Sequence, residues 1–279
     1  MTRLLTIGYS PCPNDTYIFY ALVHNRVRVE GIEFRERLED VETLNQLALR
    51  VELDLTKISY HALGHLREHY ALFRSGGALG RGCGPLIVAQ PGINLSDLKD
   101  GTITVPGTLT TAYLLLRLFD PTLTNFTVMP FDRIMDAVAR GETNAGLIIH
   151  ESRFTYLQYK LEKLLDLGEW WEHFSSMPIP LGGILGKRSL GNEVLLRVEA
   201  GIRESIRYAE THPDEVLGYC KQHSQEMDET VMKQHIDLYV NDFSLDLGQE
   251  GITAVQRLFA EAEARGILPP SNKPLLAEE

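Results

Sequence analysis

The stretch AGLIIHESRF, residues 145–154, carries the side chain best suited to chemistry in this sequence. Its apolar start predicts a strand buried on both faces, and His150 follows that strand directly, with Glu151 next. Ligands of open α/β sheets bind just beyond the carboxyl ends of the strands. Histidine is also the side chain that moves a proton most readily near neutral pH. His150 is therefore a candidate catalytic residue; the alternative is a histidine that closes the strand and bonds to nearby backbone.

Polar residues also follow or end three other predicted strands. Ser10 and Asn14 come after the apolar LLTIGY. Lys57 and Ser59, two positions apart in LDLTKIS, share one face of their strand. Gly107 follows TITVP and leads into a helix that begins among threonines. We expect the fold to bring these sets and His150 to one crevice.

The loop VPGTLTTAY has the features of an anion site. Gly107 permits a tight turn, and the first N–H groups of the following helix lack partners within the helix. A carboxylate placed there would gain charge-assisted hydrogen bonds. The alternative is ordinary N-capping by Thr108 or Thr110. Lys57 is either a second anion contact or a solvated lysine at a strand end.

Other motifs exclude several common chemistries. The glycine-rich residues 76–84 lack the GK[ST] of a P-loop and lead into an apolar strand, so they do not predict a phosphate site. HESRF is not the zinc motif HExxH, because position 154 is Phe154, and no GxSxG occurs. Cys12, between two prolines, has no base near it in the sequence, which favours a small turn residue over a reactive thiol. The remaining histidines lack ligand spacing and are expected at the surface: His24, His61, His65, His69, His173, His212, His223 and His235.

The composition is that of a globular protein of 279 residues with 44% hydrophobic and 23% charged residues. Its net charge of −11 argues against a nucleic-acid partner, because phosphate binding needs a basic stripe. Because this negative charge repels an anionic substrate at long range, local hydrogen-bond donors must hold such a substrate. No apolar run is long enough to span a bilayer, so membrane insertion is not expected. Three widely spaced cysteines favour a reduced, cytoplasmic protein.

Strands that alternate with helices predict the α/β class. We infer one lobe from residues 1–90 and 180–279, which includes the C-terminal helices, and an inserted second lobe over 91–179. The chain would cross between them around Ile87–Ala89 and Pro180–Gly183. Two lobes joined in this way give a type II periplasmic-binding-protein-like fold, with mixed, mostly parallel sheets and a hinged interlobe cleft.

Seven segments together resemble the 1,4-dihydroxy-6-naphthoate synthases of the futalosine route to menaquinone. The segments span nearly the whole chain: SPCPNDTYIFYALV, LEDVETLN, LTKISY, RSGGALGRGCGPLIV, VPGTLTTAY, AGLIIHESRFTY and YVNDFSLDLGQEG. The resemblance implies the two-lobe fold inferred above. It also implies a lyase that converts cyclic dehypoxanthine futalosine to 1,4-dihydroxy-6-naphthoate and dihydroxyacetone.

The resemblance assigns roles to particular positions. It implies that His150 is the general base and that five positions bind substrate: Lys57, Ile58, Ser59, Thr111 and Ala112. We add four further candidates for the cleft: Ser10, Asn14, Gly107 and Glu151. The expected partner is a small anionic aromatic substrate, and no cofactor or metal is expected. The oligomeric state is left open, a homodimer included.

Two other functions compete with this interpretation. Chorismate dehydratase belongs to the same pathway, but HESRF after the buried strand argues against it. A non-catalytic solute-binding protein would need export, and the N-terminal MTRLLTIGYSPCPND carries no export signal.

Overall fold

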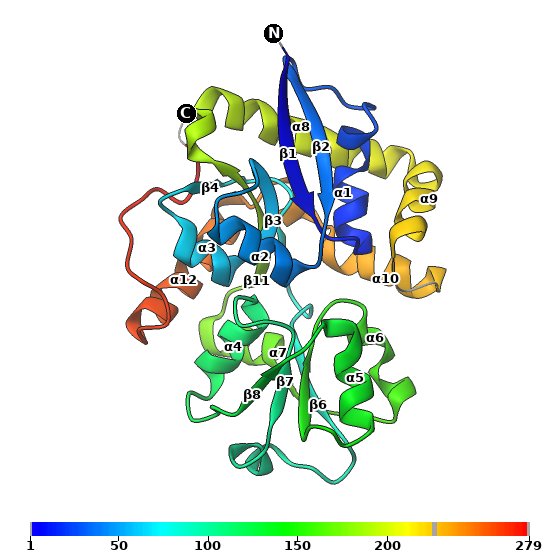
Figure 1. Ribbon diagram of the computed structural model, residues 1–279, viewed down its shortest axis with the longest axis vertical. Coiled ribbons are helices and arrows are strands. Elements are labelled where there is room, and N and C mark those ends of the chain that lie inside the picture. Colours follow the sequence, from blue (N-terminus) through cyan, green and yellow to red (C-terminus); the bar gives the residue numbers. More distant parts are fainter. Residues whose placement is uncertain (1, 225–227, 278–279) are drawn as a thin grey trace.

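Two β-sheets, each with its own helices, lie one above the other in the computed structural model, which describes residues 2–224 and 228–277 (Figure 1). The upper sheet contains β1 (Arg3–Tyr9), β2 (Ile32–Leu38), β3 (Leu55–Ser59), β4 (Tyr70–Leu72), β5 (Ala78–Gly80) and β11 (Ile179–Lys187). Its order is β2-β1-β3-β11-β4, and β5 also pairs with β11. The lower sheet contains β6 (Leu86–Ala89), β7 (Ile103–Val105), β8 (Phe126–Val128), β9 (Ala145–Ile148) and β10 (Glu162–Asp166), in the order β10-β6-β9-β7-β8.

The helices divide between the sheets in the same way. Lobe 1 is the upper sheet with α1 (Pro13–Val23), α2 (Val41–Leu49), α3 (Tyr60–Leu66), α8 (Asn192–Thr211), α9 (Pro213–His223), α10 (Glu229–Tyr239), α11 (Asp242–Leu245) and α12 (Gly248–Ala264). Lobe 2 is the lower sheet with α4 (Thr111–Phe119), α5 (Phe131–Ala139), α6 (Ser152–Thr155) and α7 (Leu167–Ser175). Short 3₁₀ helices cover Leu95–Lys99, Tyr156–Tyr159 and Arg188–Leu190.

Both sheets are mixed, with less parallel pairing than the sequence led us to expect. β1 pairs in parallel with β2 and β3, and β7 with β8 and β9. β6 and β11 instead pair antiparallel with all their partners. These are the two strands that follow a passage of the chain from one lobe to the other, so they enter their sheets from the opposite end.

The passages come a few residues earlier than expected. Ile87–Ala89 were expected at the first crossing, but they lie in β6 inside the second sheet, so the chain changes sheets between Gly80 and Leu86. It returns between Ser175 and Ile179. The apolar LIVA is buried at each residue between β9 and β10, and burial of that run accounts for its place in the second sheet.

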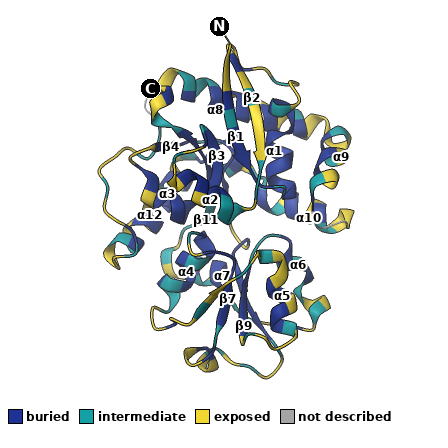
Figure 2. Ribbon diagram, in the orientation of Figure 1, coloured by how far each residue is buried: buried dark blue, intermediate teal, exposed yellow. Residues whose placement is uncertain are grey.

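The strands that lead to the expected crevice are the buried ones. β3 and β9 are buried along their whole length, whereas β2, at the edge of the first sheet, is largely exposed (Figure 2). The expectation that the apolar run ending at Ile149 forms a strand buried on both faces is confirmed for Ala145–Ile148, whereas Ile149 lies beyond the strand and is half-buried. The helices α1, α3 and α4 each begin shortly after a strand, so their first turns lie near the carboxyl ends of β1, β3 and β7.

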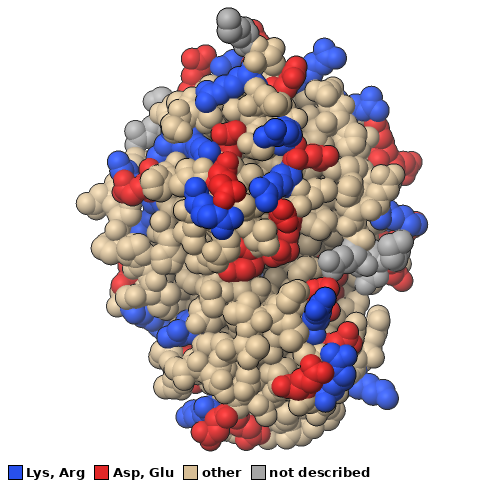
Figure 3. Space-filling view, viewed as in Figure 1, with Lys and Arg blue, Asp and Glu red and all other residues tan. Residues whose placement is uncertain are grey.

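Two features of the described residues bear on charge and on membrane-spanning helices. On the face shown in Figure 3, acidic and basic side chains are interspersed, and the described residues form no extended basic stripe there. Among the helices of the described ranges, none combines the length and the apolar character needed to cross a membrane.

The first passage between the lobes depends on two glycines in close contact. A Cβ atom built on Gly84 would overlap with the Cα and N atoms of Gly168, and backbone cannot give way as a side chain can. We expect Gly84→Ala to lower the free energy of unfolding by about 1–3 kcal/mol. Gly218→Ala is the control, because nothing lies within 4 Å of that Cβ position in α9, and there alanine should stabilise by up to about 1 kcal/mol. Thermal unfolding of both variants checks this; equal midpoints for Gly84→Ala and wild type would contradict it.

Candidate active site

A cavity between the two lobes gathers most of the residues expected at the crevice. About 670 Å³ of space there is not filled by protein atoms, and part of that space is open solvent. The expected residues that line it are Ser10, Asn14, Lys57, Ile58, Ser59, Thr111, Ala112 and His150. Asp15, Leu181, His235 and Tyr239 also line it. Gly107 and Glu151 lie outside this lining.

His150 enters the cavity from the end of β9. Its φ of 56° is in the left-handed region, which histidine adopts several times more often than most non-glycine residues. The Phe131 ring packs against the imidazole in an edge-to-face arrangement, with ring centroids 4.9 Å apart. The Nε2 atom of His150 is buried and has no hydrogen-bond partner in the described part of the chain.

The charge state of His150 follows from its surroundings. Burial lowers the pKa of the imidazole to about 4; the Asp15 carboxylate acts in the opposite direction, and Lys57 adds to the lowering. The ring is therefore neutral near neutral pH. A neutral imidazole has one nitrogen lone pair with which to accept a proton.

The residues after His150 are anchored by a buried ion pair. Arg153 donates to Asp166 over 2.8 Å, and the Asp166 side chain is wholly buried. Asp166 also caps α7, because its carboxylate accepts from the N–H groups of Gly168 and Glu169. This ion pair therefore holds the residues after His150 against the start of α7.

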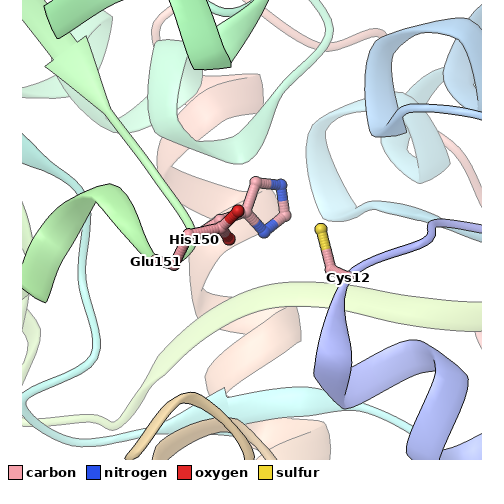
Figure 4. Close-up of side chains that lie close together, drawn as sticks. All are labelled: Cys12, His150 and Glu151. Atoms are coloured by element: carbon pink, nitrogen blue, oxygen red, sulfur yellow. The ribbon is translucent and has the colours of Figure 1, made fainter. Parts of the chain in front are cut away.

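Cys12 and Glu151 lie beside the His150 ring (Figure 4). The Sγ atom of Cys12, a ring nitrogen of His150 and a carboxylate oxygen of Glu151 are all within 4.8 Å of one another. No base is near Cys12 in the sequence, but the fold brings one beside it, because β9 and the start of α1 come from distant parts of the chain. Burial raises the pKa of the Cys12 thiol well above its usual range, and the charge of Glu151 adds to this, so the thiol is protonated.

His235, expected at the surface, is wholly buried and stacks on His150. The two ring centroids are 6.2 Å apart and the planes differ by 20°. Helix α10 carries His235 on the same face as Met232, Ile236 and Tyr239, which are also buried. This apolar period of three and four residues in VMKQHIDLY is the sequence signal that could have revealed its burial.

Hydrogen bonds fix the tautomer of His235. Asn14 donates through Nδ2 to Asp15 Oδ1 over 3.0 Å, so its Oδ1 is the acceptor that lies 2.9 Å from His235 Nε2. His235 Nε2 therefore carries the proton and Nδ1 carries the lone pair. Burial, followed by the influence of His150 and Lys57, lowers the pKa of His235 well below its usual range. The ring is neutral.

Lys57 is paired rather than free. Its Nζ atom lies 2.7 Å from Asp15 Oδ1 and donates to the Gly76 carbonyl over 3.1 Å. The side chains of Lys57 and Asp15 are only 6% and 5% exposed. Ser10 donates to the same carboxylate over 2.7 Å. Lys57 therefore contributes to the cavity as half of a neutral pair and not as an isolated cation.

Ser59 is held in place by α2. Asn45, wholly buried in that helix, accepts from the Ser59 N–H over 3.0 Å and donates to its hydroxyl over 3.2 Å. This two-sided contact fixes the end of β3 at the cavity wall. Asn45 is a supporting residue that was not predicted from the sequence.

At the start of α4, one residue caps the helix, and the next two carry N–H groups without partners in the helix. Thr110 accepts from the Tyr113 N–H over 3.2 Å, so the capping interpretation is right for this residue. Thr111 and Ala112 are the first two residues of the helix, line the cavity, and carry N–H groups that have no partner within the helix. A substrate carboxylate placed at these groups would also be favoured by the helix dipole.

The Gly107 side of the same loop already faces a carboxylate. Glu42 of α2 accepts from the Leu109 N–H over 3.3 Å, and a Cβ on Gly107 would overlap with the Glu42 side chain. Burial raises the pKa of Glu42. Gly107 thus lets lobe 2 approach α2 and is a packing position rather than a lining residue of the cavity.

Thr111 also joins the lobes. Its hydroxyl donates to the Leu181 carbonyl in β11 over 2.6 Å. We expect Thr111→Val to raise KM by roughly 3–10-fold with kcat little changed, because losing one hydrogen bond costs about 0.5–1.5 kcal/mol and frees the start of α4. The matched control is Thr108→Val, at an exposed position of the same loop. Steady-state kinetics decide, and an unchanged KM in Thr111→Val would count against this wall as a binding surface.

Comparisons with known proteins agree with this architecture. The family model described as "Menaquinone biosynthesis" matches residues 5–264. A protein of Thermus thermophilus named "1,4-dihydroxy-6-naphtoate synthase" is 52% identical over 271 residues, covering 97% of this chain and 98% of that one. A crystal structure of an Archaeoglobus fulgidus protein, 37% identical, superimposes with a TM-score of 0.90 over 95% of this chain and 98% of that one. An alkanesulfonate-binding protein of Xanthomonas axonopodis bound to MOPS, 15% identical, gives a TM-score of 0.71 over 97% and 96% of the two chains, which confirms the periplasmic-binding-protein-like fold.

Proposed function

Because the chain belongs to the menaquinone biosynthesis family, as one of its 1,4-dihydroxy-6-naphthoate synthases, we propose that it converts cyclic dehypoxanthine futalosine with His150 as the general base. The observation that carries the role of His150 is its geometry. A neutral imidazole at the end of β9 lines the interlobe cavity, and its buried Nε2 atom has no hydrogen-bond partner among the described residues.

The proposed reaction begins with transfer of a proton from a substrate carbon to the lone pair of His150. The electron pair left behind drives cleavage of a carbon–carbon bond, and a three-carbon fragment leaves as dihydroxyacetone. Aromatisation of the second ring supplies much of the driving force. The steps are neither oxidative nor reductive, so the residues of the cavity suffice as acid and base.

The remaining residues would bind and orient the substrate. The N–H groups of Thr111 and Ala112 suit an aryl carboxylate, since they offer hydrogen bonds and the positive end of α4. The stacked ring of His235 and the ring of Phe131 restrict the orientation of His150. Closure of the lobes would exclude water and hold the reacting carbon against the base.

The test of this function is turnover by the purified protein without added cofactor. Incubation with the cyclic precursor should give 1,4-dihydroxy-6-naphthoate, measured by absorbance, and dihydroxyacetone in equal amounts. Chorismate, supplied in parallel, should remain unchanged, which separates this activity from that of a dehydratase. Binding of the precursor without either product would contradict the proposal and favour a solute-binding protein. The cytoplasmic location and the lack of a required cofactor stay predictions of the sequence.

A further inference from the structure

A buried group of metal-ligating atoms spans the two lobes next to the cavity. Cys12 at the start of α1 belongs to lobe 1, whereas His150 and Glu151 follow β9 of lobe 2, and the three side chains converge (Figure 4). Their sulfur, nitrogen and oxygen atoms lie within 4.8 Å of one another. A thiolate, an imidazole and a carboxylate are ligand types of protein zinc sites, and three protein ligands with an open fourth position are common.

A buried nitrogen without a hydrogen-bond partner among the described residues lies beside this group. His235 is wholly buried, and its Nδ1 atom lies 3.9 Å from Glu151 Oε2, one of the carboxylate oxygens of the same group. Nδ1 has no hydrogen-bond partner within the described ranges. Buried polar atoms of this kind normally find a partner, and an ion is one of the partners that satisfy them.

We propose that Cys12, His150 and Glu151 bind a divalent cation of the zinc class, and that the bound ion reversibly blocks the His150 base. The first half of this inference stands on the geometry alone, and the second half rests on the proposed function. On binding, the Cys12 thiol releases its proton to solvent and forms a metal–sulfur bond, with no change of oxidation state.

The geometry requires only a small rearrangement. Zinc binds sulfur at about 2.3 Å and nitrogen or oxygen at about 2.0–2.2 Å, so the ligand atoms need to approach by roughly an ångström. Since Cys12 and His150 belong to different lobes, a slight closure of the cleft supplies this movement. The fourth position would be left for water or for a substrate oxygen.

Cobalt(II) absorption tests the site without any measurement of activity. The protein is first treated with EDTA, which is then removed, and Co²⁺ is titrated in the absence of thiol reductants. We expect one equivalent of Co²⁺ to produce the sulfur-to-cobalt charge-transfer band of a cobalt thiolate. Cys12→Ser should lack this band. Cys220→Ser should retain it, because Cys220 is equally buried and also contacts the start of α1, but is not one of the three ligands.

Two results would overturn the site: wild-type protein without the band at saturating Co²⁺, or a band of full strength in Cys12→Ser. The wild-type titration decides even if a variant fails to fold.

Inhibition is tested separately with Zn²⁺, which should lower the turnover of wild type by at least roughly tenfold and be reversed by EDTA. Each variant is compared with its own metal-free rate, and Cys12→Ser should be far less sensitive. A cobalt band without zinc inhibition would refute only the block of His150, whereas failure of metal-free turnover would refute the proposed function and leave the cobalt result standing.

Discussion

His150→Asn is expected to lower kcat by about 10²–10⁴-fold, because an amide cannot accept the proton that the imidazole takes. The fold should survive this change. Position 150 has a left-handed φ of 56°, and asparagine is among the non-glycine residues that tolerate this conformation best. Steady-state kinetics with the cyclic precursor measure the loss, and the thermal midpoint measures the fold.

Two controls separate chemistry from structure at this position. His150→Ala removes the base as well, but alanine in the left-handed region costs about 1–2 kcal/mol of stability, so it should unfold at a lower temperature than His150→Asn. His69→Asn, at an exposed position of lobe 1, should keep wild-type kinetics. A kcat of His150→Asn within about threefold of the wild-type value would contradict the assignment of His150 as the base, because loss of a general base lowers kcat far more than that.

The largest expected effect on stability follows from Lys57→Met. The substitution leaves the Asp15 carboxylate buried and without its ammonium partner, which typically costs about 3–5 kcal/mol. Ser10 and Asn14 still donate to that carboxylate, but neither supplies a charge. Urea denaturation should show the loss as a lower midpoint with an unchanged slope.

The double variant Lys57→Met with Asp15→Asn distinguishes the pair from the packing of the lysine stem. Removing both charges should recover most of the stability that the single variant loses, since no uncompensated charge remains. A double variant no more stable than Lys57→Met would show that the loss comes from packing. The buried-pair explanation would then be wrong.

Local patterns in the sequence were enough to place His150. The apolar AGLI forms the buried strand that it predicts, and the residue after a buried strand lies at the sheet edge where α/β proteins bind ligands. The same reasoning correctly brought Ser10, Lys57 and Thr111 to one cavity. These predictions succeeded because strand period and strand polarity are short-range properties.

The features that could not be predicted depend on distant parts of the chain. His235 stacks on His150 only because α10 of lobe 1 packs beside the end of β9, 85 positions earlier in the sequence. The pairing of Lys57 with Asp15 joins β3 to α1 and turns an expected anion contact into a neutral pair. The early passage into β6 likewise depends on which sheet has room for a strand buried on both faces. None of these contacts has a signature within one segment.

The most direct test is a crystal structure of His150→Asn with unreacted cyclic dehypoxanthine futalosine. We expect the substrate in the interlobe cavity, with its acidic carbon facing residue 150 and its carboxylate at the N–H groups of Thr111 and Ala112. A substrate bound outside the cavity, or one whose acidic carbon faces away from residue 150, would contradict the role of His150 as the base.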